Sequence, residues 1–305
     1  MNKCIKKIRI FALDFVIKSL GKGVSYDLFK KLSNDFGIEA VTVSGDSGQI
    51  TGAPSELIMG SYIRHGLYNP DIVNLITKRL LTNGAGTFID IGANIGLITV
   101  PVACNSQAII HAFEPEPKNF GYLSRNVRDN LEDDRLTLHN IALVGNSGSL
   151  QFELSSDNFG DHRIRRESKI SKQKFNETGR QVIKVIGERL DERVNPDELP
   201  HPIVVKIDTQ GAEVEVVRGG QILFSAADYI ISEYCPYMLL RAGSEPSEFL
   251  EFVRSFPYAA LMDDTSEIEL VLKPVEEVIE AMTSFPQDGS AACHVDILLA
   301  RSNGI

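Results

Sequence analysis

Short apolar runs and longer amphipathic stretches follow one another along most of this chain. The runs are rich in β-branched residues, as buried strands are, and occupy residues 87–91, 106–113, 136–142, 202–207, 227–234, 258–262 and 293–300. Helical patterns occupy residues 95–104, 118–130, 212–218, 247–256 and 275–282. Because strands and helices alternate, the pattern predicts an α/β fold, doubly wound, with helices on both faces of a mostly parallel sheet.

Residues 1–68 precede this alternation, and we interpret them as an N-terminal extension with a helix and a hairpin. Within the extension, residues 38–43 alternate like a strand, and residues 49–51 return as its partner after a glycine turn. The remaining residues, 69–305, are expected to form the main domain. A polar insertion at residues 155–180 interrupts that domain.

The first 22 residues combine basic and apolar character. An apolar run at residues 10–17 is flanked by Lys3, Lys6, Lys7, Arg9, Lys18 and Lys22. The run is too short to span a membrane, so we expect no transmembrane segment, and a signal peptide fits poorly because no small-residue cleavage site follows. Two interpretations of residues 3–22 stay open. One is a helix that packs on the domain or on a second subunit of a homodimer, and the other is a peripheral contact with an anionic membrane surface.

The overall composition is that of a folded protein, with 43% hydrophobic and 24% charged residues. The net charge of −10 argues against nucleic acid as a partner, because such binding needs basic surface. The four cysteines form no Cys-x-x-Cys pair, and the six histidines show no ligand spacing. We therefore expect no metal site, and buried, reduced thiols in a cytoplasmic protein.

A glycine turn follows the first core strand in the segment Asp90-Ile91-Gly92-Ala93-Asn94-Ile95-Gly96. Gly92 permits a turn that a Cβ atom would crowd, and Gly96 lets the next helix approach closely. The segment departs from the G-x-G-x-x-G fingerprint of dinucleotide sites, because Asn94 replaces the second glycine and Leu97 the third. The Asp90 carboxylate would repel a phosphate but suits a cation. We therefore favour S-adenosylmethionine, which carries a sulfonium and an amino group, over the NAD(P) of an oxidoreductase.

Glu114 ends the second core strand, one βα unit after the glycine turn. A carboxylate at that place can accept hydrogen bonds from both hydroxyls of a ribose. The alternative is that Glu114 only caps the helix that begins near Pro115 and Pro117. The expected cofactor-binding residues of this part of the chain are Asp90, Gly92, Asn94, Gly96 and Glu114.

Four segments of the chain together resemble the motifs of the FkbM family of S-adenosylmethionine-dependent methyltransferases. They are Phe88 to Gly96, Ala112 to Pro115, Asn140 to Leu143 and Lys206 to Glu213, in the family's order. The resemblance covers about Tyr68 to Tyr234. It implies a class I, Rossmann-like methyltransferase fold with seven strands, of which the last is antiparallel.

The same resemblance implies S-adenosylmethionine as cofactor and methylation of a hydroxyl on a sugar or secondary metabolite, so the acceptor is a small molecule or a glycan. An amine or protein side chain is the first alternative acceptor. A non-catalytic S-adenosylmethionine-binding module is a further alternative, because the family usually carries an acidic residue where this chain has Gln210.

Several residues near the ends of the later strands are candidates for the site. Asn140 and Ala142 follow the third strand and are expected to line the adenine pocket. Asp208 ends the fourth strand, where it can act as a base, orient the acceptor or cap the next helix. Lys206 can pair with Asp208 or anchor an acidic acceptor, and Glu213 is expected to compensate the helix dipole. By contrast, we expect Asn126 and Asn130 to be solvated helix residues.

The polar insertion carries His162 beside Asp161 and three nearby arginines. The plain interpretation is a solvated basic loop. The alternative is a lid over the acceptor, in which the arginines hold an anionic group and His162 removes a proton. On that hypothesis His162 and Asp208 flank the acceptor, one as base and the other as orienting residue.

Overall fold

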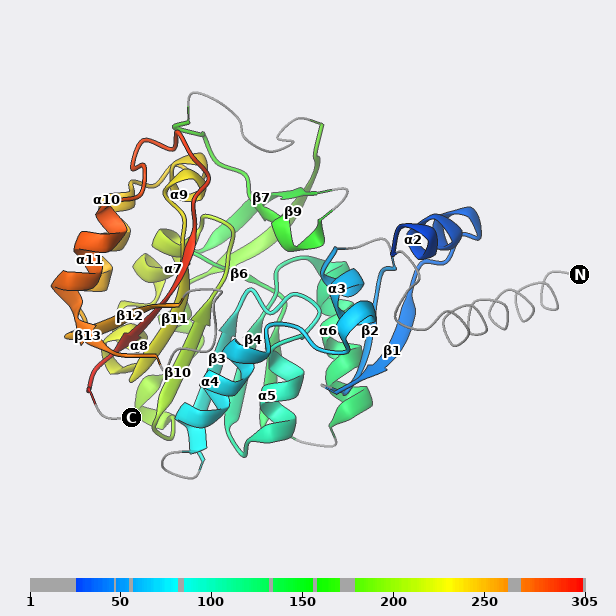
Figure 1. Ribbon diagram of the computed structural model, residues 1–305, viewed down its shortest axis with the longest axis horizontal. Coiled ribbons are helices and arrows are strands. Elements are labelled where there is room, and N and C mark those ends of the chain that lie inside the picture. The colour runs from blue at the N-terminus through cyan, green and yellow to red at the C-terminus, as the bar shows by residue number, and fades with distance from the viewer. Residues whose placement is uncertain are drawn as a thin grey trace, which may run out of the picture.

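In the computed structural model, the main sheet has helices on both faces, and a smaller sheet and an N-terminal hairpin lie beside it (Figure 1). The structure describes residues 26–46, 48–54, 57–81, 85–131, 134–155, 158–170, 179–262 and 270–303. The basic segment at residues 3–22, with its two interpretations, lies outside the described residues.

The main sheet has eight strands in the order β13-β12-β14-β11-β10-β3-β4-β5. In chain order they are β3 (Thr87–Ile91), β4 (Ile109–Phe113), β5 (Leu136–His139), β10 (Ile203–Ile207), β11 (Tyr229–Tyr234), β12 (Tyr258–Met262), β13 (Lys273–Pro274) and β14 (Val295–Ala300). The last strand, β14, runs antiparallel to both of its neighbours. The doubly wound, mostly parallel sheet is confirmed, and the two-residue strand β13 is added at the edge to the seven expected strands.

The strand order reverses direction between β3 and β10, the two central strands. All five residues of each are buried, because helices cover both faces of the sheet. Ligands of doubly wound proteins bind at such a reversal, beyond the carboxyl ends of the strands. The register pairs Asp90 with Lys206, so the fold places a buried carboxylate and a buried ammonium on adjacent strands.

Two layers of helices cover the sheet. The helices are α4 (Pro70–Leu81), α5 (Thr99–Asn105), α6 (Pro117–Asn130), α7 (Glu213–Gly219), α8 (Gln221–Ala226), α9 (Pro236–Arg241), α10 (Pro246–Arg254) and α11 (Val275–Thr283). One core layer joins α7 to α11 with Ile89 and Ile91 of β3. The other joins α4 and α5 with Phe88, whose side chain points to the opposite face of the same strand.

Two predicted elements differ from the observed ones. The helix predicted from residue 95 begins at Thr99, because Asn94 and Gly96 adopt left-handed backbone angles, with φ of 52° and 90°. The strand predicted at residues 136–142 divides into β5 in the main sheet and β6 (Ala142–Leu143) in the smaller one. Helices α8 and α9 were not predicted.

The smaller sheet has the strand order β6-β9-β7-β8. It is built from β6, β7 (Gly148–Leu154), β8 (Arg163–Ile164) and β9 (Gln181–Glu188). The predicted polar insertion therefore contributes β8 to this sheet, where it pairs with β7. A short helical turn at Phe159–Asp161 precedes β8. Residues 156–157 and 171–178 of the insertion lie outside the described part.

The N-terminal extension contains α2 (Tyr26–Asp35), β1 (Val41–Gly45), β2 (Gly48–Gly52) and α3 (Leu57–His65). The expected hairpin is confirmed, since β1 and β2 pair antiparallel. Ile50, Met59 and Tyr62 share a core with Ile95 and Leu123, so the extension packs directly on the main domain. The domain boundary at residue 68 stays a prediction.

The solvated environment expected for two asparagines of α6 is wrong. Asn126 is fully buried, and its side chain bonds to the backbone N–H and carbonyl of Thr51 in the hairpin. Asn130 makes the same pair of bonds to Gln49, at a more exposed position. Both side chains therefore tie the hairpin to the helix.

The cysteines differ in part from the expectation of buried thiols. Cys104, Cys235 and Cys293 are free, but only Cys235 is buried, and the other two are exposed. Among the described residues, no group of three or more histidine, cysteine or acidic side chains could hold a metal ion. Within the same part of the chain, no helix has the length and apolar character needed to cross a membrane.

Candidate active site

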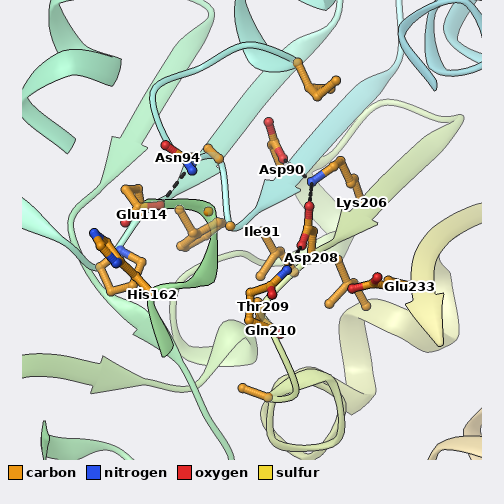
Figure 2. Close-up of a pocket in the computed structure, with 18 of the residues that line it drawn as sticks. Asp90, Ile91, Asn94, Glu114, His162, Lys206, Asp208, Thr209, Gln210 and Glu233 are labelled. Carbon is orange, nitrogen blue, oxygen red and sulfur yellow. Dashed lines mark hydrogen bonds and ion pairs between the residues drawn. The ribbon is translucent and has the colours of Figure 1, made fainter. Parts of the chain in front are cut away.

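A cavity of about 410 Å³ lies at the carboxyl ends of β3, β4, β10 and β11. This volume is within the range of about 300–1,000 Å³ found for small-molecule sites. Charged residues from all four strand ends line it, namely Asp90, Glu114, Lys206, Asp208 and Glu233 (Figure 2). The cavity is therefore a polar site at the reversal of strand order, with more carboxylates than cations.

Gly92 allows the ends of the two central strands to meet. It has φ of 83°, and a Cβ atom at this position would lie 1.9 Å from the carbonyl oxygen of Asp208. Any other residue would push the strand ends apart. Gly96 has a different place: a Cβ atom there would meet Leu123 of α6 at 2.8 Å, and Gly96 does not line the cavity. It allows helix packing and does not contact the cavity.

Asp90 lies under the glycine turn and is completely buried. Its Oδ2 accepts a hydrogen bond of 2.6 Å from the hydroxyl of Thr99, and its Oδ1 lies 3.8 Å from Nζ of Lys206. Burial raises the pKa of Asp90, and the positive charge of Lys206 and the Thr99 hydroxyl oppose that rise.

Glu114 is held against the glycine turn by backbone donors. Its Oε2 accepts from the N–H of Asn94 at 2.9 Å, and its Oε1 accepts from the N–H of Glu116 at 2.8 Å. The residue that caps α6 is Glu116, which accepts from the N–H of Asn119, so Glu114 does not serve as the helix cap. Burial raises the pKa of Glu114 to about 8, although the two backbone bonds lower it. Each oxygen keeps a further lone pair for a ligand.

The two residues expected after the third strand have different positions. Ala142 lines the cavity with Ile141 and Leu143. Asn140 does not line it, and instead its side-chain amide donates to the carbonyls of Glu114 and Pro115 at 2.8 and 3.2 Å. Asn140 thus fixes the turn that carries Glu114, which corrects its expected place in the adenine pocket.

Lys206 and Asp208 form an ion pair beside the glycine turn. Nζ of Lys206 lies 3.3 Å from Oδ2 of Asp208, and the Gln210 side-chain amide donates to Oδ1 at 3.1 Å (Figure 2). Burial lowers the pKa of Lys206, but the carboxylates of Asp208 and Asp90 outweigh burial and raise it above the ordinary value. Lys206 is therefore a cation at neutral pH, placed between a buried carboxylate and a partly exposed one.

The loop after Asp208 is closed by Glu213 and not by Asp208. Oε1 of Glu213 accepts from the backbone N–H groups of Thr209 and Gly211, at 3.1 and 3.2 Å. Glu213 is buried, so its role exceeds the dipole compensation expected for it. Because another side chain binds these backbone groups, the Asp208 carboxylate is left to face the cavity.

His162 lines the cavity but lies toward Glu114, across from Asp208 (Figure 2). Its Nδ1 accepts from the N–H of Ser155 at 3.0 Å, and its ring centroid lies 5.2 Å from that of Phe159. Burial lowers the pKa of His162 to about 4, with a further contribution from the charge of Arg180. The structure therefore does not bring His162 and Asp208 together, and His162 is a weak base at neutral pH. Its catalytic role stays a prediction.

The arginines of the insertion pair with acidic side chains. Asp161 lies 3.6 Å from Arg163 and 3.4 Å from Arg241, and also pairs with Arg180. Arg241 in addition donates to the carbonyl of Gln210 at 2.9 Å. None of these arginines lines the cavity. They connect the insertion to α9 and to the loop that carries Asp208.

Two residues at the start of β14, His294 and Asp296, line the cavity and were missed by the sequence reasoning. The sequence patterns predicted site residues only at the carboxyl ends of strands. Strand β14 is antiparallel, so its N-terminal end lies at this edge of the sheet. The antiparallel direction implied by the family resemblance was the signal that could have found them.

The sequence model described as the methyltransferase FkbM domain matches residues 90–260, more than half of the chain. This chain belongs to the FkbM methyltransferase family. The matched region contains Asp90, Glu114, Lys206, Asp208 and Glu233, so the charged residues of the cavity lie within the family domain.

The hexuronic acid methyltransferase AglP of Haloferax volcanii is similar in sequence to this chain. It is 32% identical to this FkbM family chain over 161 residues, which cover 52% of the chain and 57% of the relative. The chain therefore matches little more than half of the relative's length.

Solved methyltransferase structures also match this family member. Precorrin-6y C5,15-methyltransferase from Geobacter metallireducens is 12% identical, with a TM-score of 0.35 over 75% of this chain and 88% of that one. Magnesium protoporphyrin IX methyltransferase from Synechocystis, with bound SAM, is 10% identical, with a TM-score of 0.36 over 76% of this chain and 79% of that one.

Proposed function

We propose that the chain is an S-adenosylmethionine-dependent methyltransferase that methylates a hydroxyl group of a sugar. The observation that carries the proposal is Glu114, a buried carboxylate bound to the backbone of the glycine turn and facing the cavity. The Lys206–Asp208 pair lies farther along the same cavity, where an acceptor would meet the methyl group. Membership of the FkbM family supports the same conclusion.

The residues of the cavity suit S-adenosylmethionine. Glu114 would hold the ribose hydroxyls, and the apolar side chains of Ile141 and Ala142 would cover the adenine. Asp90 and the turn at Gly92 and Asn94 would lie at the positively charged end of the molecule. When bound, S-adenosylmethionine supplies a methyl group on a positively charged sulfur, which keeps the bonding electron pair as a neutral thioether.

Asp208 is the residue proposed to receive the proton of the acceptor hydroxyl. Its carboxyl oxygens accept hydrogen bonds from Lys206 and Gln210, which hold the group in place at the cavity. With a side chain 42% exposed, Asp208 is accessible to an acceptor. Because the sulfonium is already activated, the other task of the chain is to hold the acceptor oxygen in line with the methyl group.

A sugar is proposed as the acceptor because the similar curated protein is named a hexuronic acid methyltransferase. The acceptor can be a free small molecule or part of a glycan. The cytoplasmic location, the homodimer and the lack of a nucleic-acid partner remain predictions from the sequence.

The proposal is tested by incubating the full chain with methyl-labelled S-adenosylmethionine and a panel of neutral sugars, hexuronic acids and amines. We expect label in a sugar hydroxyl. Asp208→Asn should retain cofactor affinity and lose about a hundredfold or more in turnover, the usual loss for a general base. His162→Asn serves as the matched variant, and we expect it to keep most of its turnover near neutral pH because a pKa of about 4 makes His162 a weak base.

Two results would contradict the proposal. One is the absence of S-adenosylmethionine binding in calorimetry with the unmodified chain. The other is methylation of amines alone, which would support the alternative acceptor class. Loss of turnover in His162→Asn with full activity in Asp208→Asn would exchange the roles assigned to the two residues.

A further inference from the structure

Glu233 lies beside Asp208 at the cavity edge of the sheet. Strands β10 and β11 are parallel and pair Ile207 with Ser232, so the next residue of each, Asp208 and Glu233, meet at the same edge. Side chains alternate along strands, which puts Glu233 on the face of β11 that also carries Ile231. Figure 2 shows Glu233 on the same side of the pocket as Lys206 and Asp208.

The carboxyl group of Glu233 makes no hydrogen bond or ion pair within the described residues, whereas its neighbours have partners. Asp208 is bound by Lys206 and Gln210, and Glu213 is bound by the backbone of its own loop. Buried or half-buried polar groups normally have partners, so an unused carboxyl group facing a cavity indicates a partner that enters from the cavity. The carboxyl group of Glu233 is therefore available to bind a ligand, whereas the backbone of its own loop already occupies that of Glu213.

The surroundings of Glu233 favour its uncharged form. Among the described residues, carboxylates face it from three elements, namely Asp208 after β10, Glu213 in α7 and Asp296 in β14, and the charge of Lys206 opposes them. Cys235 lies two residues farther on, between β11 and α9, and His294 precedes β14 at the cavity. Burial is the largest cause, and together with these charges it raises the pKa of Glu233 to about 9. At neutral pH the group thus carries a proton that it can donate.

We propose that Glu233 donates a hydrogen bond to the methyl acceptor and that the neighbouring Asp208 accepts one from it, so that the pair recognises neighbouring hydroxyls of an uncharged polyol segment. This inference rests on the proposed function. A hydroxyl group both donates and accepts, and thus satisfies both side chains. A carboxylate at the same place would face the carboxylates of Asp208 and Asp296. If the acceptor is a hexuronic acid, its carboxylate therefore points away from this end of the cavity.

The first test needs no acceptor. When folding raises the pKa of a carboxyl group, the group stabilises the folded protein less and less as pH rises from the pKa of the unfolded chain to the pKa of the folded protein. The melting temperature of Glu233→Gln should therefore exceed that of the unmodified protein by a margin that widens from about pH 6 to pH 9 and then stays constant. Glu277→Gln, at an exposed position of α11, is the control and should show a constant difference. A constant difference for Glu233→Gln as well would overturn the inference.

The second test uses the sugar found in the labelling panel. Glu233→Gln keeps an uncharged donor of similar shape and should retain kcat/KM within about threefold, whereas Glu233→Ala should raise KM about tenfold or more. Equal losses in both variants, or none in Glu233→Ala, would overturn the inference while leaving the proposed function intact. If no sugar in the panel is methylated, the proposed function and the inference fail together, although the stability curves would still report the charge state of Glu233.

Discussion

Two buried carboxylates face the glycine turn from different strands, and their partners differ. Asp90 is bound by a hydroxyl and lies near a lysine, whereas Glu114 is bound only by backbone N–H groups. A nearby cation favours the ionised form of a carboxyl group directly. At Glu114 the backbone N–H groups also favour ionisation, but burial opposes it more strongly and raises the pKa. Glu114 consequently titrates near neutral pH, and its ionisation should be linked to the binding of a ribose.

Binding of 5′-methylthioadenosine should therefore depend on pH through Glu114. This ligand has the ribose hydroxyls but no amino group that titrates near pH 8. The ionised carboxylate is the better acceptor, so below a pKa of about 8 the protein must release a proton on binding. We expect affinity to rise up to about tenfold per pH unit from pH 6 to pH 8 and to level off above, as measured by calorimetry.

Glu114→Gln is the matched control for this dependence. It should bind about ten- to a hundredfold more weakly at pH 8, because hydrogen bonds to a charged acceptor contribute about 1.5–3 kcal/mol. Its affinity should not vary with pH in this range. An affinity of the unmodified protein that stays flat from pH 6 to pH 9 would show that Glu114 does not hold the ribose in the way proposed.

Gln210 stands where the resemblance to the family's motifs implies an acidic residue. The residue has φ of 57°, and its side-chain amide donates to Asp208. A side-chain donor at this position satisfies one oxygen of Asp208, whereas an ionised acidic residue could not donate. The departure is therefore compatible with a catalytic role of Asp208 and gives no specific support to a non-catalytic module.

At the scale of elements, the hairpin and α6 are joined by a repeated pairing of asparagine side chains with strand backbone. Asn126 and Asn130 are four residues apart, or about 6 Å along a helix, and Thr51 and Gln49 are two residues apart, or about 6.6 Å along a strand. The similar spacings let each amide bond to one backbone N–H and one carbonyl of β2. The two side chains thus act like a short additional strand at the edge of the hairpin.

The two asparagine side chains should differ in their contribution to the stability of the protein. Asn126→Ala leaves the backbone of Thr51 and the carbonyl of Ile95 without partners at a buried position, so we expect the free energy of unfolding to fall by about 2–4 kcal/mol. Asn130→Ala should cost under about 1 kcal/mol, because water can replace its bonds at an exposed position. Urea denaturation of both variants measures the difference, and equal losses would refute this account.

The insertion is also attached at the scale of elements. Asp161 pairs with arginines from β8, from the residue before β9 and from α9, and Lys169 donates its N–H to the carbonyl of Leu240 in α9. The same arginine of α9 binds the Gln210 carbonyl, two residues after Asp208. The described part of the insertion is therefore connected with the acceptor side of the cavity through α9.

At the scale of the whole molecule, the described residues that line the cavity begin at Ile58, and their charged members lie at the strand ends of the main sheet. Residues 1–22, by contrast, carry six lysines and arginines in a chain of net charge −10. The segment is thus a basic region of an acidic protein, and its predicted role is contact with a second subunit or an anionic surface.

Deletion of residues 1–22 should leave cofactor affinity within about twofold of the full chain, since the described residues that line the cavity begin at Ile58. It should change elution in size-exclusion chromatography if the segment joins two subunits, or reduce sedimentation with anionic liposomes if it binds lipid. A truncated protein that matches the full chain in both assays would exclude both roles. A large loss of cofactor affinity would place the segment at the site.

The sequence by itself determined the order of strands and helices, the glycine turn and the carboxylate at the end of the second strand. These features depend on residues close together in the chain: apolar runs bury strands, glycine permits left-handed turns, and a strand end fixes where the next residue lies. The alternation therefore predicted the doubly wound sheet, and Asp90, Gly92, Asn94, Glu114 and Ala142 line the cavity at one edge of it.

Only the tertiary structure decided which side chains meet and how they are charged. The ion pair of Lys206, the burial that makes His162 a weak base, the partners of Asn126 and the presence of Asp296 at the cavity depend on residues far apart in the chain. Burial and charge act through distances in space, and a pKa responds to all surrounding groups. A local sequence pattern contains neither the burial of a side chain nor the charges around it, so the charge states of Glu114 and Glu233 could be obtained only from the fold.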